Sequence, residues 1–450
     1  MITFLMILYC LECVIYEIKG EPVFDHNGIV IRQRIYFVLI QILAFSTLCL
    51  KLGQLDYAFL GVMDLIVLLS TVVLMEMIYP SVNKVLANNM IMLIGIGFII
   101  ISRLDFNKTI RQFVIVTVSL CLALVLTKLF SYYKKIRDLY IVFAVIGLAI
   151  LLMVLILGHT VNGSKISFSI AGLKFQPSEF AKIIFVIFIA GAFAVADKFY
   201  RVLLICVVAA MYVLALVFSR DLGNALIFFI TFLFVLFIAT RNYAFLILGF
   251  MGGAGASVIA YRMFSHVRVR VQAFLDPFSK IDNQGYQITQ SLFAISCGGF
   301  FGMGLSKGVP EDIPFVESDF IFSAVSEEMG AIAAVCLLMI CFSSFMILMR
   351  NAMINRSRFC RLLLVGSAVL YIFQVFLTVG GGIKFIPLTG VTLPFVSYGG
   401  SSVMTSIFLF MICQGVIVVN NDKLYEEWLE ENDDSEEEYS DYDEEEDTNS

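Results

Sequence analysis

The sequence contains few of the residues that build metal and redox centres. Its 450 residues include one Trp and three His, and His26, His159 and His266 are too separated to indicate a haem or a His-based metal centre. The ten Cys are scattered, mostly inside apolar runs, without paired metal-ligand spacing. These patterns argue against a zinc site and against a disulfide framework.

Charge is also scarce, since Asp, Glu, Lys and Arg together make up 15% of the chain and hydrophobic residues make up 60%. The mean hydropathy is +0.93, far too apolar for a soluble protein. Apolar runs repeatedly approach the roughly 20 residues that a helix needs to cross a bilayer. We therefore predict an all-α polytopic membrane protein.

The net charge of −6 hides an uneven distribution. After Lys423 the chain has fifteen acidic residues and no basic one, which leaves 30 basic against 21 acidic residues, or +9, in the remainder. The body is basic, as expected for cationic membrane loops. We predict that residues 421–450 form an acidic cytoplasmic tail, with Asp433–Ser450 disordered because it offers little apolar surface.

Hydropathy divides the rest of the chain into an N-terminal extension, residues 1–86, and a ten-helix core, residues 87–420. The three spans predicted in the extension are Ile2–Ile18, Ile35–Leu50 and Tyr57–Ile78. The ten core spans are Met90–Ser102, Phe113–Phe130, Leu139–Leu157, Glu179–Ala196, Val202–Phe218, Leu222–Ala239, Tyr243–Tyr261, Phe320–Met349, Leu362–Leu377 and Val403–Val419.

Basic turns set the expected orientation. Lys134, Lys135 and Arg137 lie in one turn and Arg350–Arg361 holds four arginines in another, so the positive-inside rule places both turns in the cytoplasm. The segments His159–Ser178, Ser219–Asp221, Ser265–Ser318 and Gly380–Ser402 then face outside. We predict that the long loop at 265–318 is ordered and forms part of a site.

Asp319 follows this loop at the start of an apolar run, where a carboxylate can remain ionised beside water. It is a candidate chemical group, and the alternative is that Ser318 and Asp319 only cap a helix. Glu179 and Lys182 are three residues apart on one face of the helix that Pro177 opens. We expect this pair to contact Asp319, because buried charges require partners; the alternative is an ion pair that only fixes helix packing.

Basic residues in the outer segments, among them Lys165, Arg268 and Arg270, suit an anionic lipid headgroup such as a diphosphate. Interfacial anchoring to phospholipid phosphates explains the same charges equally well.

The chain resembles the SEDS family of shape, elongation, division and sporulation proteins, typified by RodA, FtsW and SpoVE, over about Asn89 to Val419. The motifs that carry the resemblance are FQPSEFAK (Phe175–Lys182), SRDLGNAL (Ser219–Leu226), RVRVQAFLDP (Arg268–Pro277), GYQITQS (Gly285–Ser291), ESDFIFSAVSEEMG (Glu317–Gly330) and PLTGVTLPFVSYGGSS (Pro387–Ser402).

This resemblance implies a ten-helix fold in the bacterial cytoplasmic membrane and a glycosyltransferase that polymerises lipid II on its outer face, with a class B penicillin-binding protein as partner and no nucleic acid. It implies Asp319 as the essential aspartate, with Glu179 and Lys182 as the intramembrane pair. Our candidate substrate-binding residues are Lys165, Gln176, Ser178, Arg268, Arg270, Gln287, Gln290, Ser291, Ser397, Tyr398 and Ser401. No metal ligand is assigned, and a requirement for Mg²⁺ or Mn²⁺ stays open.

The chain departs from the family pattern at several positions, including Arg220, Asn224, Phe315 and Glu317. Glu317 is expected to raise the pKa of Asp319 through like-charge proximity. A lipid II transporter and a non-catalytic scaffold that recruits a transpeptidase stay open as alternatives, because intramembrane charges also line translocation paths.

Overall fold

The computed structural model describes residues 1–19, 27–161, 164–170, 173–281 and 285–447. For residues 131, 159–161, 164–170, 173–174, 280 and 428–447 it describes the backbone alone. Within the described ranges, twelve helices are long and apolar enough to cross a membrane. They are α2 (Asn27–Leu52), α3 (Asp56–Ile78), α4 (Lys84–Leu104), α5 (Phe106–Leu129), α7 (Tyr140–Leu157), α8 (Pro177–Ala194), α9 (Phe199–Phe218), α10 (Leu222–Thr240), α11 (Tyr243–Met263), α15 (Ala331–Ile354), α16 (Arg358–Gly382) and α17 (Gly400–Asp447).

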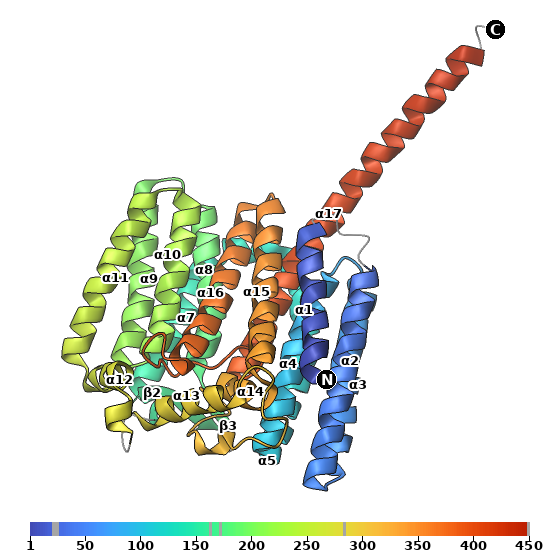
Figure 1. The fold of residues 1–450 in the computed structure, drawn as a ribbon. Coiled ribbons are helices and arrows are strands. Elements are labelled where there is room, and N and C mark those ends of the chain that lie inside the picture. Colours follow the sequence, from blue (N-terminus) through green and yellow to red (C-terminus); the bar gives the residue numbers. More distant parts are fainter. Residues whose placement is uncertain (20–26, 162–163, 171–172, 282–284, 448–450) are drawn as a thin grey trace.

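A further helix, α1 (Ile2–Lys19), packs against α2 and α15 beside the spanning helices (Figure 1). Its buried Glu12 accepts hydrogen bonds from Arg32, at 2.6 Å from Nε, which compensates the carboxylate. Tyr9 of α1 donates to Asn89 of α4 at 3.0 Å. The three helices predicted before the core are present, and polar contacts join them to it.

One predicted span is wrong, because Phe320–Met349 is not a single helix. The chain forms α14 (Ile321–Met329), breaks at Gly330 and continues as α15. Gly330 has φ of 92°, and a Cβ there would lie 2.4 Å from both the backbone N of Gly302 and the carbonyl O of Phe300. A glycine can adopt this conformation and permit this close approach. Glu327 and Glu328, two charged residues inside the predicted span, were the available sequence signal for the break.

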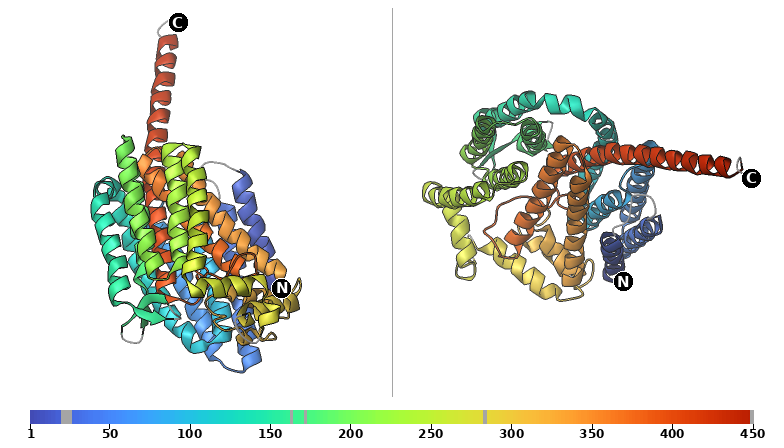
Figure 2. Two further views of the ribbon diagram at one scale, coloured as in Figure 1. Left: turned by 90° about the vertical axis from the view of Figure 1, so that its left-hand side faces the viewer. Right: turned by 90° about the horizontal axis from the view of Figure 1, so that it is seen from above.

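Burial orders the helices from the centre of the bundle to its edge. The most apolar stretch of α4 is buried at every residue, whereas α11 buries none and lies at the periphery (Figures 1 and 2). A helix that is apolar on all sides can occupy the centre. The two kinds of helix have similar hydropathy, so composition alone does not separate them.

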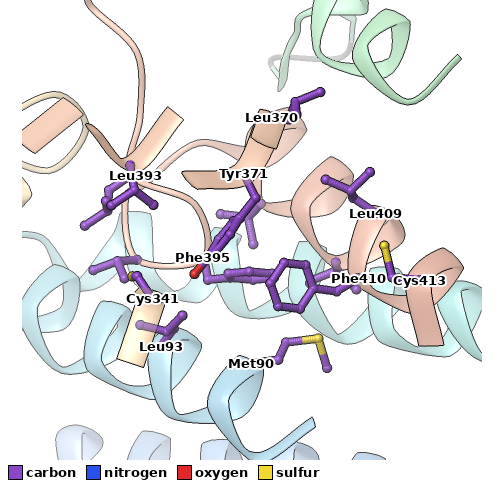
Figure 3. Packing of buried hydrophobic residues seen from close by; sticks show 14 of the residues in the cluster. Met90, Leu93, Cys341, Leu370, Tyr371, Leu393, Phe395, Leu409, Phe410 and Cys413 are labelled. Atoms are coloured by element: carbon purple, nitrogen blue, oxygen red, sulfur yellow. The ribbon is translucent and has the colours of Figure 1, made fainter. Parts of the chain in front are cut away.

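An aromatic cluster packs the segment between α16 and α17 against the centre of the bundle (Figure 3). Phe395 lies 4.6 Å from Phe410, measured between ring centroids, and Phe410 lies 4.9 Å from Tyr371. All three rings are almost fully buried, and Met90 of α4 lies beside them. This packing fixes the segment that leads to the candidate site.

The bundle has two unlike ends (Figure 1). The loop end carries α12 (Ser265–Leu275), α13 (Tyr286–Gly298), the turns before α14, and three short strands. The tail end is the opposite one, from which α17 leaves the bundle. The strands β1 (His159–Val161), β2 (Ser164–Ile170) and β3 (Leu173–Phe175) form an antiparallel sheet in the order β1-β2-β3, an element not predicted in an otherwise helical protein.

In the tail, α17 continues to Asp447, over most of the segment for which we predict disorder. No Pro or Gly follows Gly415, and Glu is a good helix former. A helix that is already nucleated in the membrane can extend at little cost. Residues 448–450 lie outside the described range.

Candidate active site

Asp319 lies in the turn that precedes α14. Its backbone N–H donates to the carbonyl O of Phe315 at 3.0 Å. The residue before the first turn of α14 is Phe320, and no side chain caps that helix. The alternative that Asp319 serves only as a helix cap therefore does not hold.

Three contacts fix the backbone around Asp319. The Ser397 hydroxyl donates to the carbonyl O of Ser318 at 2.5 Å, and Tyr398 N–H donates to the carbonyl O of Glu317 at 2.7 Å. Lys108 of α5 forms a 2.7 Å ion pair with the Glu317 carboxylate. Ser397 and Tyr398 therefore hold the turn that carries Asp319, whereas the sequence suggested that they bind substrate.

Arg270 approaches Asp319 from α12. Its Nη1 donates to the carbonyl O of Thr389 at 2.8 Å. A Cβ on the neighbouring Gly390 would lie 3.5 Å from Arg270 Nη2 and 3.7 Å from Asp319 Oδ2, so both side chains reach the same glycine. The absence of a side chain at Gly390 leaves room between a cation and a carboxylate.

Burial raises the pKa of the Asp319 carboxyl to about 6. A hydrogen bond with Ser318 and the positive charge of Arg270 oppose this rise, and Glu317 adds to it, as expected from the sequence. Desolvation is the main cause, because removal from water disfavours the charged form. A carboxyl with this pKa is largely ionised at neutral pH and can still accept and release a proton.

Glu179 and Lys182 form a buried ion pair on α8, with Nζ 2.8 Å from Oε1. Lys182 also donates to Gln374 Oε1 at 3.1 Å, and Thr405 donates to the other Glu179 oxygen at 3.4 Å. The expected contact with Asp319 is not met, since no hydrogen bond or ion pair among the described side chains joins them. The pair is satisfied within the bundle, so it needs no third charge.

Gln374 connects this pair to the loop end. Its amide Nε2 donates to the carbonyl O of Thr392 at 3.0 Å, in the same segment as Gly390. Sequence reasoning missed Gln374 and Thr405, although uncharged polar residues inside apolar spans were available as a signal.

Asp221 was also missed as a site residue. It caps α10 and accepts a hydrogen bond of 2.8 Å from the Asn224 side chain. The Ser178 hydroxyl donates a second hydrogen bond to it at 3.4 Å. Burial raises its pKa, and the Asn224 hydrogen bonds and the charge of Lys182 oppose this. The charge of Asp221 also opposes the lowering of the Arg270 pKa by burial. Asp221 therefore interacts electrostatically both with Lys182 of the buried pair and with the arginine beside Asp319.

The other predicted site residues divide into two groups. Gln176 and Ser401 are joined, since the Gln176 backbone N–H donates to the Ser401 hydroxyl at 3.0 Å, and the Gln176 side chain donates to Ser178 at 3.1 Å. Arg268, Gln287 and Gln290 are exposed or partly exposed at the loop end and make no hydrogen bond or ion pair within the described set. These three side chains are available to a ligand.

Two assignments change. Ser291 is fully buried, and its hydroxyl pairs with Ser323 at 2.6 Å and donates to the carbonyl O of Gly382 at 2.8 Å, so it joins helices and does not face a ligand. The side chain of Lys165 lies outside the described residues, although its backbone belongs to β2. No group of three or more His, Cys, Asp or Glu able to hold a metal occurs in the part of the chain that the structure describes.

The fold and the site together define a class: a multi-pass helical membrane protein with an ionisable carboxylate, a cation and free polar side chains gathered at one end. The family of FtsW, RodA and SpoVE, described as cell cycle proteins, matches residues 81–421. The chain belongs to this family, and it is a multi-pass protein of the cytoplasmic membrane.

Curated relatives agree with this membership. The peptidoglycan glycosyltransferase RodA of Mycobacterium tuberculosis is 34% identical over 363 residues, which cover 74% of this chain and 77% of the relative. The probable peptidoglycan glycosyltransferase FtsW of Pseudoalteromonas translucida is 30% identical over 356 residues, covering 73% of this chain and 86% of the relative.

Solved structures resemble the chain as well. A chain from a structure on the coordination of polymerization and crosslinking by a peptidoglycan synthase complex aligns with a TM-score of 0.64 and 26% identity, covering 76% of this chain and 98% of that one. The Rod shape determining protein RodA of Thermus thermophilus aligns with a TM-score of 0.56 and 24% identity, over 75% of this chain and 96% of that one, and supports the fold.

Proposed function

We propose that this protein is a peptidoglycan glycosyltransferase that polymerises lipid II at the outer face of the cytoplasmic membrane. The observation that carries the proposal is the Asp319 carboxylate, held in a braced turn beside Arg270 with a pKa of about 6. The names of the curated relatives supply the reaction class, and the site supplies groups suited to it.

The reaction joins two lipid-linked disaccharides. The 4-hydroxyl of the acceptor attacks the anomeric carbon of the donor, and a C–O bond forms as the bond to the diphosphate breaks with inversion. Asp319 takes the proton of the hydroxyl as general base, a role typically worth about 10²–10⁴ in rate. The electron pair leaves with the lipid diphosphate, whose charge Arg270 and the exposed Arg268 stabilise electrostatically.

The charges of the two ends support this orientation. The short helix α6 (Tyr133–Asp138), which holds Lys134, Lys135 and Arg137, and the turn between α15 and α16 lie beside α17 at the tail end. The positive-inside rule assigns that end to the cytoplasm and the loop end, with Asp319, to the outside. The structural similarity to a chain of a peptidoglycan synthase complex supports a class B penicillin-binding protein as the partner that crosslinks the product.

The buried charges argue for an enzyme over a transporter of the same lipid. Glu179 and Lys182 bond to each other and to Gln374 and Thr405 inside the bundle, whereas Asp319, Arg270 and the exposed Arg268 lie together at the loop end. A translocation path would place such charged groups along its length.

The test is Asp319→Asn, which keeps the shape of the side chain but cannot accept a proton as a carboxylate does. The protein, purified with a candidate class B penicillin-binding protein, receives fluorescent lipid II in detergent, where flipping has no meaning. Wild type makes lysozyme-sensitive glycan chains and the Asn variant makes essentially none. The matched control is Asp312→Asn, an exposed carboxylate of the same loop, which keeps full activity.

Two outcomes would contradict the proposal. If the Asp319→Asn variant polymerises lipid II as fast as wild type, Asp319 is not the general base. Wild-type protein that makes no polymer with any plausible partner, yet moves lipid II across liposome membranes, establishes the transporter.

A further inference from the structure

A second site lies at the tail end, opposite Asp319. A cavity of about 460 Å³ opens between α6 (Tyr133–Asp138), the turn joining α15 to α16, and α17. Five cationic side chains line it: Lys134, Arg137, Arg356, Arg358 and Lys423. They come from three parts of the chain separated by more than sixty residues in sequence, so the fold assembles the cluster.

Most of this positive charge is not neutralised by the protein. Arg356 pairs with Glu427 at 2.7 Å, and Arg137 pairs with Asp138 at 2.8 Å. Lys134, Arg358 and Lys423 have no carboxylate within 4.0 Å among the side chains that the structure describes.

The hydrogen-bond partners of two of these cations are neutral. Arg358 donates to the carbonyl O of Ala239 at 3.3 Å, and Lys423 donates to the Tyr133 hydroxyl at 3.1 Å. Such contacts orient the cations without removing their charge. Positive residues at this end satisfy the topology rule wherever they lie, so their convergence on a cavity needs a separate explanation.

Part of the cavity wall is apolar. Val416, Val419 and Leu424 of α17 line it together with the cations. Cations next to apolar side chains in one cavity at a membrane surface match a phospholipid, whose phosphate is charged and whose acyl chains are not. A free phosphate ion has no use for the apolar wall and is far smaller than the cavity.

The acidic tail of the chain is the other anion close by. However, α17 runs straight out of the bundle from the cavity wall (Figure 1), so its later residues lead away from the cations. Glu427, which is on the wall itself, neutralises one arginine only.

We propose that this cavity binds the headgroup of an anionic phospholipid, with the phosphate held by Lys134, Arg358 and Lys423 and the acyl chains against the apolar side chains of α17. The site is separate from the polymerase chemistry and does not depend on it. It gives the protein a specific lipid ligand on the face opposite its substrate.

The experiment measures binding of fluorescent phosphatidylglycerol to the delipidated full-length protein in detergent, with phosphatidylcholine as the zwitterionic comparison. Wild type prefers phosphatidylglycerol. The variant Lys134→Gln/Arg358→Gln binds it at least about tenfold more weakly, because each basic residue near anionic lipid contributes about 1 kcal/mol. Both side chains are exposed, so the variant retains its fold, which its melting temperature verifies.

The matched control is Lys135→Gln/Lys198→Gln, which removes two exposed cations of the same end that do not line the cavity. It binds phosphatidylglycerol as wild type does. Equal loss in the control, or no loss in the cavity variant, overturns the proposal. Displacement of the lipid by an equimolar amount of inorganic diphosphate also overturns it and assigns the cavity to a soluble phosphate compound.

Discussion

The pKa of Asp319, raised to about 6 by burial, predicts how activity depends on pH. A general base must be ionised, so polymerisation is constant well above pH 6 and falls as the pH drops through that value. Arg270 favours the carboxylate, so Arg270→Gln raises the pKa further and moves the fall to higher pH. Initial rates from pH 5 to 8 measure both; a flat wild-type profile would exclude Asp319 as the titrating base.

Lys182 belongs to a buried pair, and its replacement separates structural from chemical roles. Lys182→Met leaves Glu179 uncompensated, which is expected to destabilise the fold by about 3 kcal/mol or more and to abolish activity. The double variant Glu179→Gln/Lys182→Met removes both charges and should regain stability without regaining activity. Melting temperature and polymerisation are measured together, and a fully active single variant would make the pair purely structural.

For individual side chains, the sequence predicts which residues matter better than it predicts which residues they contact. The spacing of Glu179 and Lys182 indicates an ion pair, and the position of Asp319 predicts a reactive carboxylate. Their surroundings depend on chain segments far apart: Lys108 braces the Asp319 turn from more than two hundred positions away. The expected contact between the pair and Asp319 failed for this reason, because Gln374 and Thr405 supply the partners instead.

Among the elements, the break at Gly330 is the sharpest test of the fold. Gly330→Ala places a Cβ against the backbone of Gly302 at a positive φ, so we expect a loss of about 2 kcal/mol or more. The control is Gly255→Ala in α11, where nothing lies within 4 Å of the new Cβ and Ala favours the helix. Thermal unfolding in detergent measures both, and equal melting temperatures would show that the break is not required.

Hydropathy predicts the elements that are long and apolar. Apolar length locates the spanning helices, and the short α1 was predicted despite its two Glu. The Gly330 break was missed although Glu327 and Glu328 stand just before it in the sequence. The three strands at 159–175 lie in a segment too short for a periodic signal to stand out. The register of the strands, the packing partners of the helices and the close approach of two backbone segments at Gly330 are tertiary properties, so only the structure reveals them.

For the whole molecule, the tasks that we propose for the two ends are separable. Deleting Asp433–Ser450 removes the last part of α17, up to Asp447, which leads away from the bundle, so polymerisation by the purified protein should stay near the wild-type level. Lys423 and Glu427 remain, so binding of phosphatidylglycerol should remain too. A large loss of polymerisation without any added partner would mean that the tail acts on the bundle directly.

The length of α17 has a consequence for reach. A helix of 48 residues is about 72 Å long at 1.5 Å per residue, more than twice the roughly 30 Å of a hydrocarbon core. The part beyond Asn420 accounts for about 40 Å of this length, several Debye lengths at physiological salt. The acidic residues are thus carried on a helical arm, and salt screens the charges at its far end from the cations at its base. The tail end therefore presents two independent surfaces of opposite sign.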